Sequence, residues 1–218
     1  MSLTLYIGNK NYSSWSFRPW LAMRAANIAF DEVLIPIYAG ADDKRRILDV
    51  SPAGKVPVLA DGDVRVWDSI AIIEYVAEKF PHAQLWPQDV ASRAHARAIS
   101  AEMHGGFGAL RRECGMNIHR PIRAKTLSDE AQENIARVQD IWTDCRKRYG
   151  QAGPFLFGSF SAADAMYAPV VHRFRTYAIA VSLPVKQYME TMLAHPAFDE
   201  WTAHALAETL VIDRFETD

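Results

Sequence analysis

The sequence predicts a mixed α/β domain followed by an all-helical domain. Strand and helix patterns alternate through residues 1–80, and only helical patterns follow the segment PHAQLWP, which has a proline at each end. A chain of 218 residues is long enough for one ordinary domain or for two small ones. We therefore expect an α/β domain over residues 1–80, a linker over 81–88 and a helical domain over 89–218.

The chain opens with a short strand pattern, in which Leu3, Leu5 and Ile7 alternate with other residues. Polar residues break this pattern, and from Ser16 the apolar residues follow helical spacing, with Pro19 expected in the first turn of the helix. Residues 12–15 then lie where a strand leads into a helix, so free backbone N–H groups and the positive end of the helix dipole meet there. Such a place favours an anion. Simple capping of the helix by a serine is the alternative interpretation.

The rest of the first domain continues this alternation. A strand is predicted at 31–37, parallel to the first because a helix connects them, and a charged helix or loop follows it. The stretch SPAGKVPVL predicts a shaped turn that enters a strand, with a cis bond at Val56–Pro57. Residues 61–63 (DGD) predict a hairpin turn to a strand at 64–67, and Asp68 or Ser69 is expected to cap a helix that ends near residue 80. This order of elements is the thioredoxin-like pattern.

The remaining segments are predicted to be helical. Apolar spacing predicts one helix over 89–111 and another over 127–149. The sequence SAAD has the chemistry of an N-capping box for a third helix, with Asp164 in the position of the usual Glu. Two more helices are expected over 184–193 and 196–206.

Composition argues against several classes of protein. Lys and Arg total 24 and Asp and Glu total 26, so the net charge of −2 does not favour a nucleic-acid binder. Cys114 and Cys145 give neither a disulfide framework nor a metal quartet, and the histidines lack the spacing of a metal site. No segment reads as a membrane span or a signal peptide, so we expect a cytoplasmic protein.

Three motifs together resemble the cytosolic glutathione S-transferases, and the resemblance covers nearly the whole chain. These motifs are SPAGKVPVL, DSIAIIEYV and FGSFSAADAMYAPV. The stretch YSSWSFRPWLAM resembles most the zeta class and its maleylacetoacetate isomerases: Ser13, Ser14 and Arg18 match the pattern of that class, and Trp15 replaces its cysteine. The resemblance implies the glutathione S-transferase fold, a thioredoxin-like domain plus a helical one, and a homodimer. The chain itself suggests for the dimer only an exposed face around Lys79 and Arg93.

The resemblance also implies a set of glutathione contacts. Ser13, with Ser14 as the second candidate, would donate its hydroxyl to the glutathione sulfur, since a free thiol has a pKa of about 8.5 and needs such help to ionise near neutral pH. The remaining implied glutathione-binding residues are Lys55, Val56, Pro57, Asp68 and Ser69. Val56 would pair through its backbone, Asp68 and Ser69 would hold the γ-glutamyl end, and Lys55 is either a partner of the glycyl carboxylate or a solvated lysine.

A second substrate, an electrophile, is expected between the domains. The candidate residues for this site are Trp15, Met103, His104, Phe107, Arg111, Arg173 and Arg175. The spacing of Met103, Phe107 and Arg111 places them near one face of the predicted helix. The glycines around 105–108 indicate a close approach to the backbone, either by a neighbouring helix or by a ligand. Trp15 is either a wall of the site or a core residue, and Arg173 or Arg175 is expected to favour acidic substrates.

The predicted function is transfer of glutathione to a small electrophile. The alternatives are a glutathione-dependent cis–trans isomerase of the maleylacetoacetate type and a non-catalytic binding protein with the same fold. Glutathione would be the only cofactor or cosubstrate, without metal, nucleic acid or membrane. A thiol–disulfide reductase with a cysteine at the first helix is excluded because no cysteine precedes Cys114.

Overall fold

A mixed four-stranded sheet forms the core of the first domain in the computed structural model, which describes residues 2–38 and 40–216. Its strands are β1 (Leu3–Ile7), β2 (Phe30–Leu34), β3 (Val58–Asp61) and β4 (Val64–Trp67), in the order β2-β1-β3-β4. β1 pairs with β2 in parallel, and the β1–β3 and β3–β4 pairs are antiparallel. The predicted thioredoxin-like sheet is confirmed.

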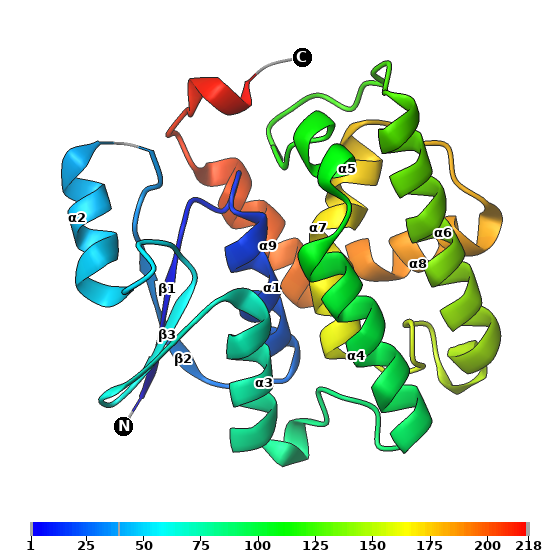
Figure 1. Ribbon diagram of the computed structural model, residues 1–218, viewed down its shortest axis with the longest axis horizontal. Helices are drawn as coiled ribbons and strands as arrows, with labels where there is room; N and C mark the ends of the chain where they lie inside the picture. Colours follow the sequence, from blue (N-terminus) through cyan, green and yellow to red (C-terminus); the bar gives the residue numbers. More distant parts are fainter. Residues whose placement is uncertain (1, 39, 217–218) are drawn as a thin grey trace.

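Three helices cover this sheet. They are α1 (Ser14–Ala25), α2 (Ala41–Val50) and α3 (Ser69–Lys79). Figure 1 shows α1 and α3 between the sheet and the helical domain, with α2 on the outer side. The face of the sheet that carries α1 and α3 therefore points toward the second domain.

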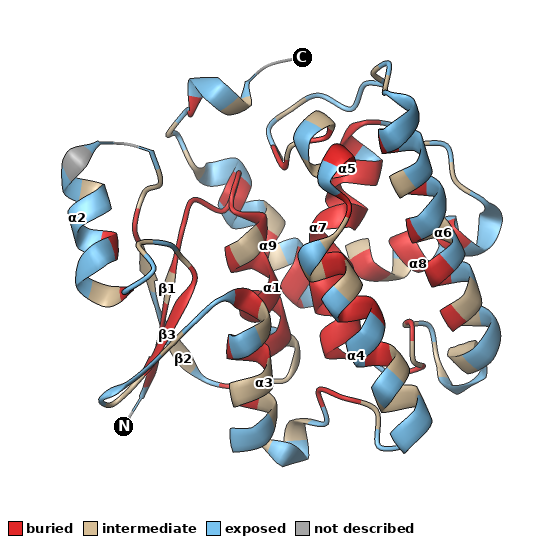
Figure 2. Cartoon of the chain, in the orientation of Figure 1, coloured by how far each residue is buried: buried red, intermediate tan, exposed pale blue. Residues whose placement is uncertain are grey.

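The helical domain surrounds one buried helix, α7. The domain contains α4 (Val90–Gly105), α5 (Gly108–Glu113), α6 (Asp129–Tyr149), α7 (Ala162–Thr176), α8 (Leu183–Leu193) and α9 (Pro196–Ala207). Short 3-10 turns lie at Pro81–Ala83, Gly150–Ala152 and Asp213–Phe215. Every residue of α7 except Arg175 is buried, and α7 packs against both α1 and α4 (Figure 2). The core thus runs without interruption across the two domains.

Local sequence signals account for several boundaries. Ser161 and Asp164 form the predicted capping box, in which the Asp164 carboxylate accepts from the Ser161 N–H and hydroxyl, both at 2.8 Å. Asp68 caps α3 by accepting from the Ile70 N–H at 3.0 Å. The hairpin turn between β3 and β4 and the cis Val56–Pro57 bond are confirmed as well.

The prediction of one helix over 89–111 is wrong. The chain breaks between α4 and α5, where Gly106 has extended backbone and Phe107 has a φ of 59°. A Cβ at Gly106 would lie 2.7 Å from the Glu102 carbonyl oxygen of the same helix, and one at Gly105 would meet nothing within 4 Å. The requirement for glycine at residue 106 therefore comes from the end of α4 itself, not from a neighbouring helix or a ligand.

Two smaller predictions about the first domain also need correction. β2 covers Phe30–Leu34 rather than 31–37. Pro19 lies inside α1 rather than in its first turn, because the helix begins at Ser14, capped by Ser13, and not at Ser16.

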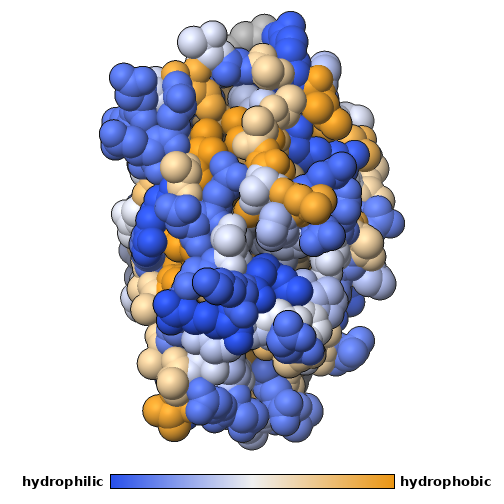
Figure 3. Space-filling model, turned by 90° about the vertical axis from the view of Figure 1, so that its right-hand side faces the viewer, coloured by the Kyte–Doolittle hydropathy of each residue, from blue (hydrophilic) through white to orange (hydrophobic). Residues whose placement is uncertain are grey.

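The outer surface of the helical domain is of mixed character. The side on which α6 lies carries apolar side chains in its upper part and a hydrophilic band across its middle (Figure 3). Among the described residues, no helix combines the length and the apolar composition that crossing a bilayer requires.

Candidate functional site

The first turn of α1 is built around two serine hydroxyls. Ser13 is the N-cap, and its Oγ accepts from the Ser16 N–H at 3.3 Å. The Ser13 and Ser16 hydroxyl oxygens are 2.8 Å apart, and the Ser16 Oγ also accepts from the Gly8 N–H at 3.0 Å. Both serines are buried. The capping role foreseen for a serine here is real, and it belongs to the candidate catalytic residue Ser13.

The loop that precedes Ser13 is held by the far end of the chain. The Glu208 carboxylate accepts from the backbone N–H groups of Lys10 and Asn11, at 2.6 Å and 3.0 Å. Trp201 of α9 donates to the Lys10 carbonyl oxygen at 3.1 Å. The Asn11 amide oxygen accepts from the backbone N–H of Ile118 at 2.6 Å. The position of Ser13 therefore depends on residues almost two hundred positions away.

Ser14 faces the helical domain. Its Oγ accepts from Nη2 of Arg173 at 3.3 Å, and the Arg173 Nε donates to the Cys114 carbonyl oxygen at 2.8 Å. The third guanidinium nitrogen, Nη1, has no hydrogen-bond partner although it is buried. Arg173 thus keeps one buried donor without a partner, on the same guanidinium group that contacts Ser14.

Two more arginines lie against Trp15, the neighbour of Ser14. The guanidinium carbon of Arg18 is 4.4 Å from the centre of the Trp15 ring, and that of Arg111 is 5.2 Å from it. Arg18 is only 1% exposed, and its Nε and Nη1 have no partner. Burial, followed by the charges of Arg173 and Arg111, lowers the pKa of Arg18 to about 9. Burial and Arg111 likewise lower the pKa of Arg173 to about 10.

We name Arg18, Arg111 and Arg173 the arginine cluster. All three remain charged near neutral pH, although burial of a cation without a partner is unfavourable. Asp68 is a carboxylate whose charge raises the pKa of Arg18 and partly offsets this cost. Unsatisfied buried donors of like charge are the expected lining of an anion-binding site.

Arg111 has a second task, at the break between α4 and α5. Its Nη2 donates to the carbonyl oxygens of Met103 at 2.6 Å and His104 at 2.9 Å, and also to that of Gly106. It therefore satisfies the open carbonyl end of α4. The expected shared helix face of Met103, Phe107 and Arg111 does not exist, because these residues belong to different elements.

A histidine links the cluster to the start of α3. The His104 Nε2 lies 3.3 Å from an Asp68 carboxylate oxygen, and the His104 ring meets the Trp15 ring edge-on at 5.2 Å. Asp68 has a φ of 78°, and the adjacent Ser69 is 1% exposed with a hydroxyl that lacks a partner. Such an orphaned hydroxyl at a helix N-terminus is suited to donate to a carboxylate.

The other residues expected at the site take different positions. Met103 is fully buried in the core, and Phe107 is 8% exposed. Lys55 is exposed, and Val56 lies just before β3, whose pairing with β1 begins at Val58. Arg175 is the exposed residue of α7, so the structure separates it from Arg173 and from the cluster.

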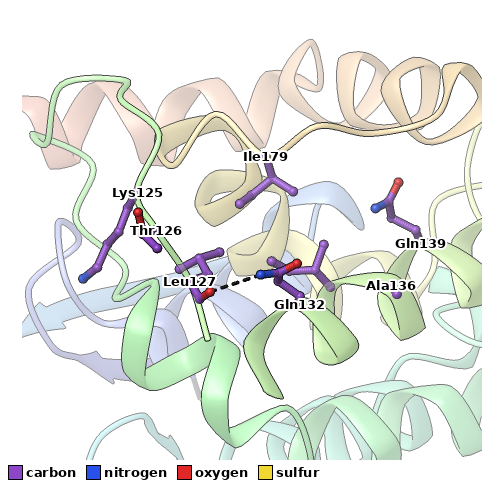
Figure 4. A pocket seen from close by; sticks show the side chains of 8 residues that line it. Lys125, Thr126, Leu127, Gln132, Ala136, Gln139 and Ile179 are labelled. Carbon is purple, nitrogen blue, oxygen red and sulfur yellow. Dashed lines mark hydrogen bonds between the residues drawn. The ribbon is translucent and has the colours of Figure 1, made fainter. Parts of the chain in front are cut away.

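Two open pockets lie away from these residues. One, of about 390 Å³, lies between α6 and the segment after α7, where Gln132 donates to the Leu127 carbonyl oxygen (Figure 4). The other, of about 430 Å³, is lined in part by Trp86, Arg148 and Phe157. Neither contains a residue expected to bind glutathione. Within residues 2–38 and 40–216, no group of three or more His, Cys, Asp or Glu side chains is placed to hold a metal ion.

The sequence did not reveal three residues of this site. Arg18 entered only as a match to a motif, Ser16 only as the start of a helical pattern, and Glu208 not at all. A polar residue at an otherwise apolar helix position was the available signal for Arg18 and Ser16. For Glu208 no local signal exists, because its partners come from the opposite end of the chain.

Family models match both domains of the chain. The model of the glutathione S-transferase N-terminal domain matches residues 12–79, and that of the C-terminal domain matches residues 123–204. A probable maleylacetoacetate isomerase from Caenorhabditis elegans is 36% identical over 99 residues, which is 45% of each chain. This match spans less than half the length of that relative.

Two longer matches are more distant in sequence. A stringent starvation protein A homolog from Histophilus somni is 24% identical over 77% of both chains. A glutathione transferase homolog from Burkholderia gl BGR1, solved with bound glutathione, superposes with a TM-score of 0.72 at 20% identity and covers 95% of this chain and all of its own. That likeness concerns the fold alone. The two domain matches identify the chain as a member of the glutathione S-transferase family.

Proposed function

We propose that this protein is a glutathione-dependent transferase that activates the glutathione thiol at Ser13 and adds it to a small electrophile. The observation that carries the proposal is the pairing of a buried serine at the N-terminus of α1 with three arginines around the next turn. A hydroxyl donor, a helix dipole and nearby cations all stabilise a thiolate. The thiol proton leaves to water, and the sulfur then attacks the electrophile.

The remaining glutathione contacts follow from the strand and helix ends. Asp68 and Ser69 hold the γ-glutamyl group at the start of α3. Val56 offers backbone groups that lie beyond the β1–β3 ladder. Lys55 is exposed, and its flexible side chain is the proposed partner of the glycyl carboxylate.

The electrophile is expected to carry a negative charge. The unpaired donors of Arg18 and Arg173 favour a carboxylate or another anionic group beside the sulfur. Trp15, covered by two guanidinium groups, presents the rest of its ring as an apolar platform.

Two other functions have specific support. Similarity to the Caenorhabditis elegans isomerase, together with Ser13, Ser14 and Arg18, favours a glutathione-dependent cis–trans isomerase. Similarity to the Histophilus somni protein, which is named for a starvation response and not for a reaction, favours a non-catalytic binding protein with the same fold. An assay of glutathione with a panel of electrophiles, including maleylacetone, separates the three: adduct formation, isomerisation without consumption of glutathione, or neither.

Replacement of Ser13 by alanine should raise the pKa of the bound thiol by roughly one to two units, because a hydrogen bond to a charged group contributes roughly 1.5–3 kcal/mol. Ultraviolet absorbance of bound thiolate against pH measures this shift. Ser14→Ala should shift the titration less, since Arg173 engages the Ser14 hydroxyl. A larger shift in Ser14→Ala than in Ser13→Ala would transfer the role to Ser14.

Substrate charge should distinguish Arg173 from Arg175. Arg173→Met is expected to raise KM roughly tenfold or more for carboxylate electrophiles, consistent with the loss of a charge-assisted hydrogen bond, and to leave KM for neutral ones nearly unchanged. Arg175→Met serves as the matched control, because that side chain is exposed on the same helix. Equal effects of Arg173→Met on charged and neutral substrates would remove Arg173 from the electrophile site.

The Arg18 side chain is expected to destabilise the ligand-free protein, so that its replacement should be stabilising. Replacing a buried, unpaired cation by an apolar side chain of similar length is expected to increase the free energy of unfolding by about 1–2 kcal/mol at pH 7. Urea unfolding of Arg18→Met measures this, with the exposed Arg97→Met as control. A decrease of more than about 1 kcal/mol would show that Arg18 is satisfied within the protein.

A homodimer is proposed because the family resemblance implies one. Lys79 pairs with Asp61, and Arg93 donates to the carbonyl oxygens of Pro87 and Gln88, so both side chains suggested for the interface already have partners in their own chain. Light scattering at micromolar concentration should give twice the mass of the chain. A monomer mass would contradict the proposal.

A further inference from the structure

Ser16 and Ser13 form a buried hydrogen-bond chain at the start of α1. The Gly8 N–H donates to the Ser16 Oγ at 3.0 Å, and the Ser13 hydroxyl donates to the same oxygen at 2.8 Å. The Ser16 N–H donates to the same Ser13 oxygen at 3.3 Å. Ser16 is 0% exposed and Ser13 is 6% exposed, so water does not replace these partners readily.

The two hydroxyls can share their protons in two ways. A serine hydroxyl has one proton to donate and two lone pairs that accept. If Ser13 donates to Ser16, its only proton is used within the protein. If Ser16 donates to Ser13, the Ser16 O–H and the Ser16 N–H fill both acceptor positions of Ser13, and the Ser13 proton must point to another acceptor.

The second arrangement is the one that a thiolate requires. The Gly8 N–H occupies one lone pair of Ser16, and its donation polarises the Ser16 hydroxyl toward Ser13, since hydrogen bonds in a chain strengthen one another. We propose that Ser16 is a positioning residue, which donates to Ser13 and thereby directs the single Ser13 proton at the glutathione sulfur. This inference rests on the proposed role of Ser13 in thiol activation.

Gly8 is a requirement of the same arrangement. A Cβ on this residue would lie 2.9 Å from the Ile37 Cγ2 and 3.2 Å from the Ser13 Oγ. Only a residue without a side chain allows the end of β1 to approach the first turn of α1 this closely. The N–H that begins the hydrogen-bond chain is therefore fixed by close packing.

These hydrogen bonds affect the glutathione thiolate through Ser13 and not through the nearby charged groups. The Ser14 hydroxyl has a different partner, Arg173, and the arginine cluster surrounds Trp15. These cations stabilise a thiolate whether or not Ser16 has a hydroxyl. The contribution of Ser16 can therefore be separated from theirs by substitution.

The test compares Ser16→Ala with the wild type in two measurements. Titration of the bound thiolate by ultraviolet absorbance should move upward by about half to one pH unit, because Ser13 loses one of the two donors that orient it. Turnover should fall roughly threefold to tenfold at neutral pH and recover as the pH rises through the new midpoint. The affinity for glutathione should change less than about twofold, since the other contacts remain.

Two further variants test whether the effect of Ser16→Ala is merely structural. Ser100→Ala removes another fully buried helical hydroxyl, one without a partner, and should leave the titration unchanged. Ser16→Cys keeps the bulk of the side chain but supplies only a weak S–H donor, so its titration should resemble that of Ser16→Ala.

The outcomes separate this inference from the proposed function. A shifted titration in Ser13→Ala with none in Ser16→Ala or Ser16→Cys would overturn the positioning role and leave Ser13 as the donor. An unchanged titration in Ser13→Ala would overturn the role of Ser13 itself. A shift in Ser16→Ala equal to that in Ser100→Ala would mark the effect as general loss of packing and would also contradict the inference.

Discussion

The burial of α1 is the constraint on which the site depends. This helix lies between the sheet and the helical domain, and it packs against α3, α7 and α9. Its apolar residues Phe17, Trp20 and Leu21 are fully buried, and so are the polar residues Ser16 and Arg18. Because a buried polar group without a partner costs free energy, each polar atom of α1 needs a partner in the protein or in a ligand. Ser16 finds protein partners, whereas Nε and Nη1 of Arg18 have no hydrogen-bond partner.

The geometry of the site also depends on contacts between residues that are far apart in the sequence. Two ends of the chain meet where Glu208 and Trp201 hold the backbone of Lys10 and Asn11. Lys10 itself is buried, with its ammonium group 2.8 Å from Glu32 and 2.9 Å from His204. These contacts join the loop before Ser13 to β2 and to α9. A change in how α9 packs would therefore reach the serine through the backbone of a short loop.

This dependence explains what the sequence predicted and what it did not. Periodic patterns and caps are local, so the sheet, the β3–β4 hairpin, the Ser161–Asp164 box and the cap of α3 were all predictable. The break between α4 and α5 was not, because Phe107 adopts a positive φ that residues of its type seldom take. The sequence marked Arg173 and Arg175 equally and did not distinguish one from the other. One is buried and the other exposed because they lie on different faces of a helix that only packing defines.

The arginine cluster also helps to decide whether the protein binds a ligand or is a scaffold that binds none. Each unsatisfied buried donor costs about 1–3 kcal/mol, and Arg18 and Arg173 together contribute three such nitrogen atoms. Local contacts offset part of this cost, since two guanidinium groups stack on Trp15 and Arg111 closes the end of α4. The rest of this free-energy cost opposes folding, and an anion that binds to the unpaired donors would remove it. A fold without a ligand would be more stable with apolar side chains at these positions. Three charged groups beside the orphaned Ser69 hydroxyl and the buried Ser13 therefore favour the proposed site, which an anionic ligand would complete.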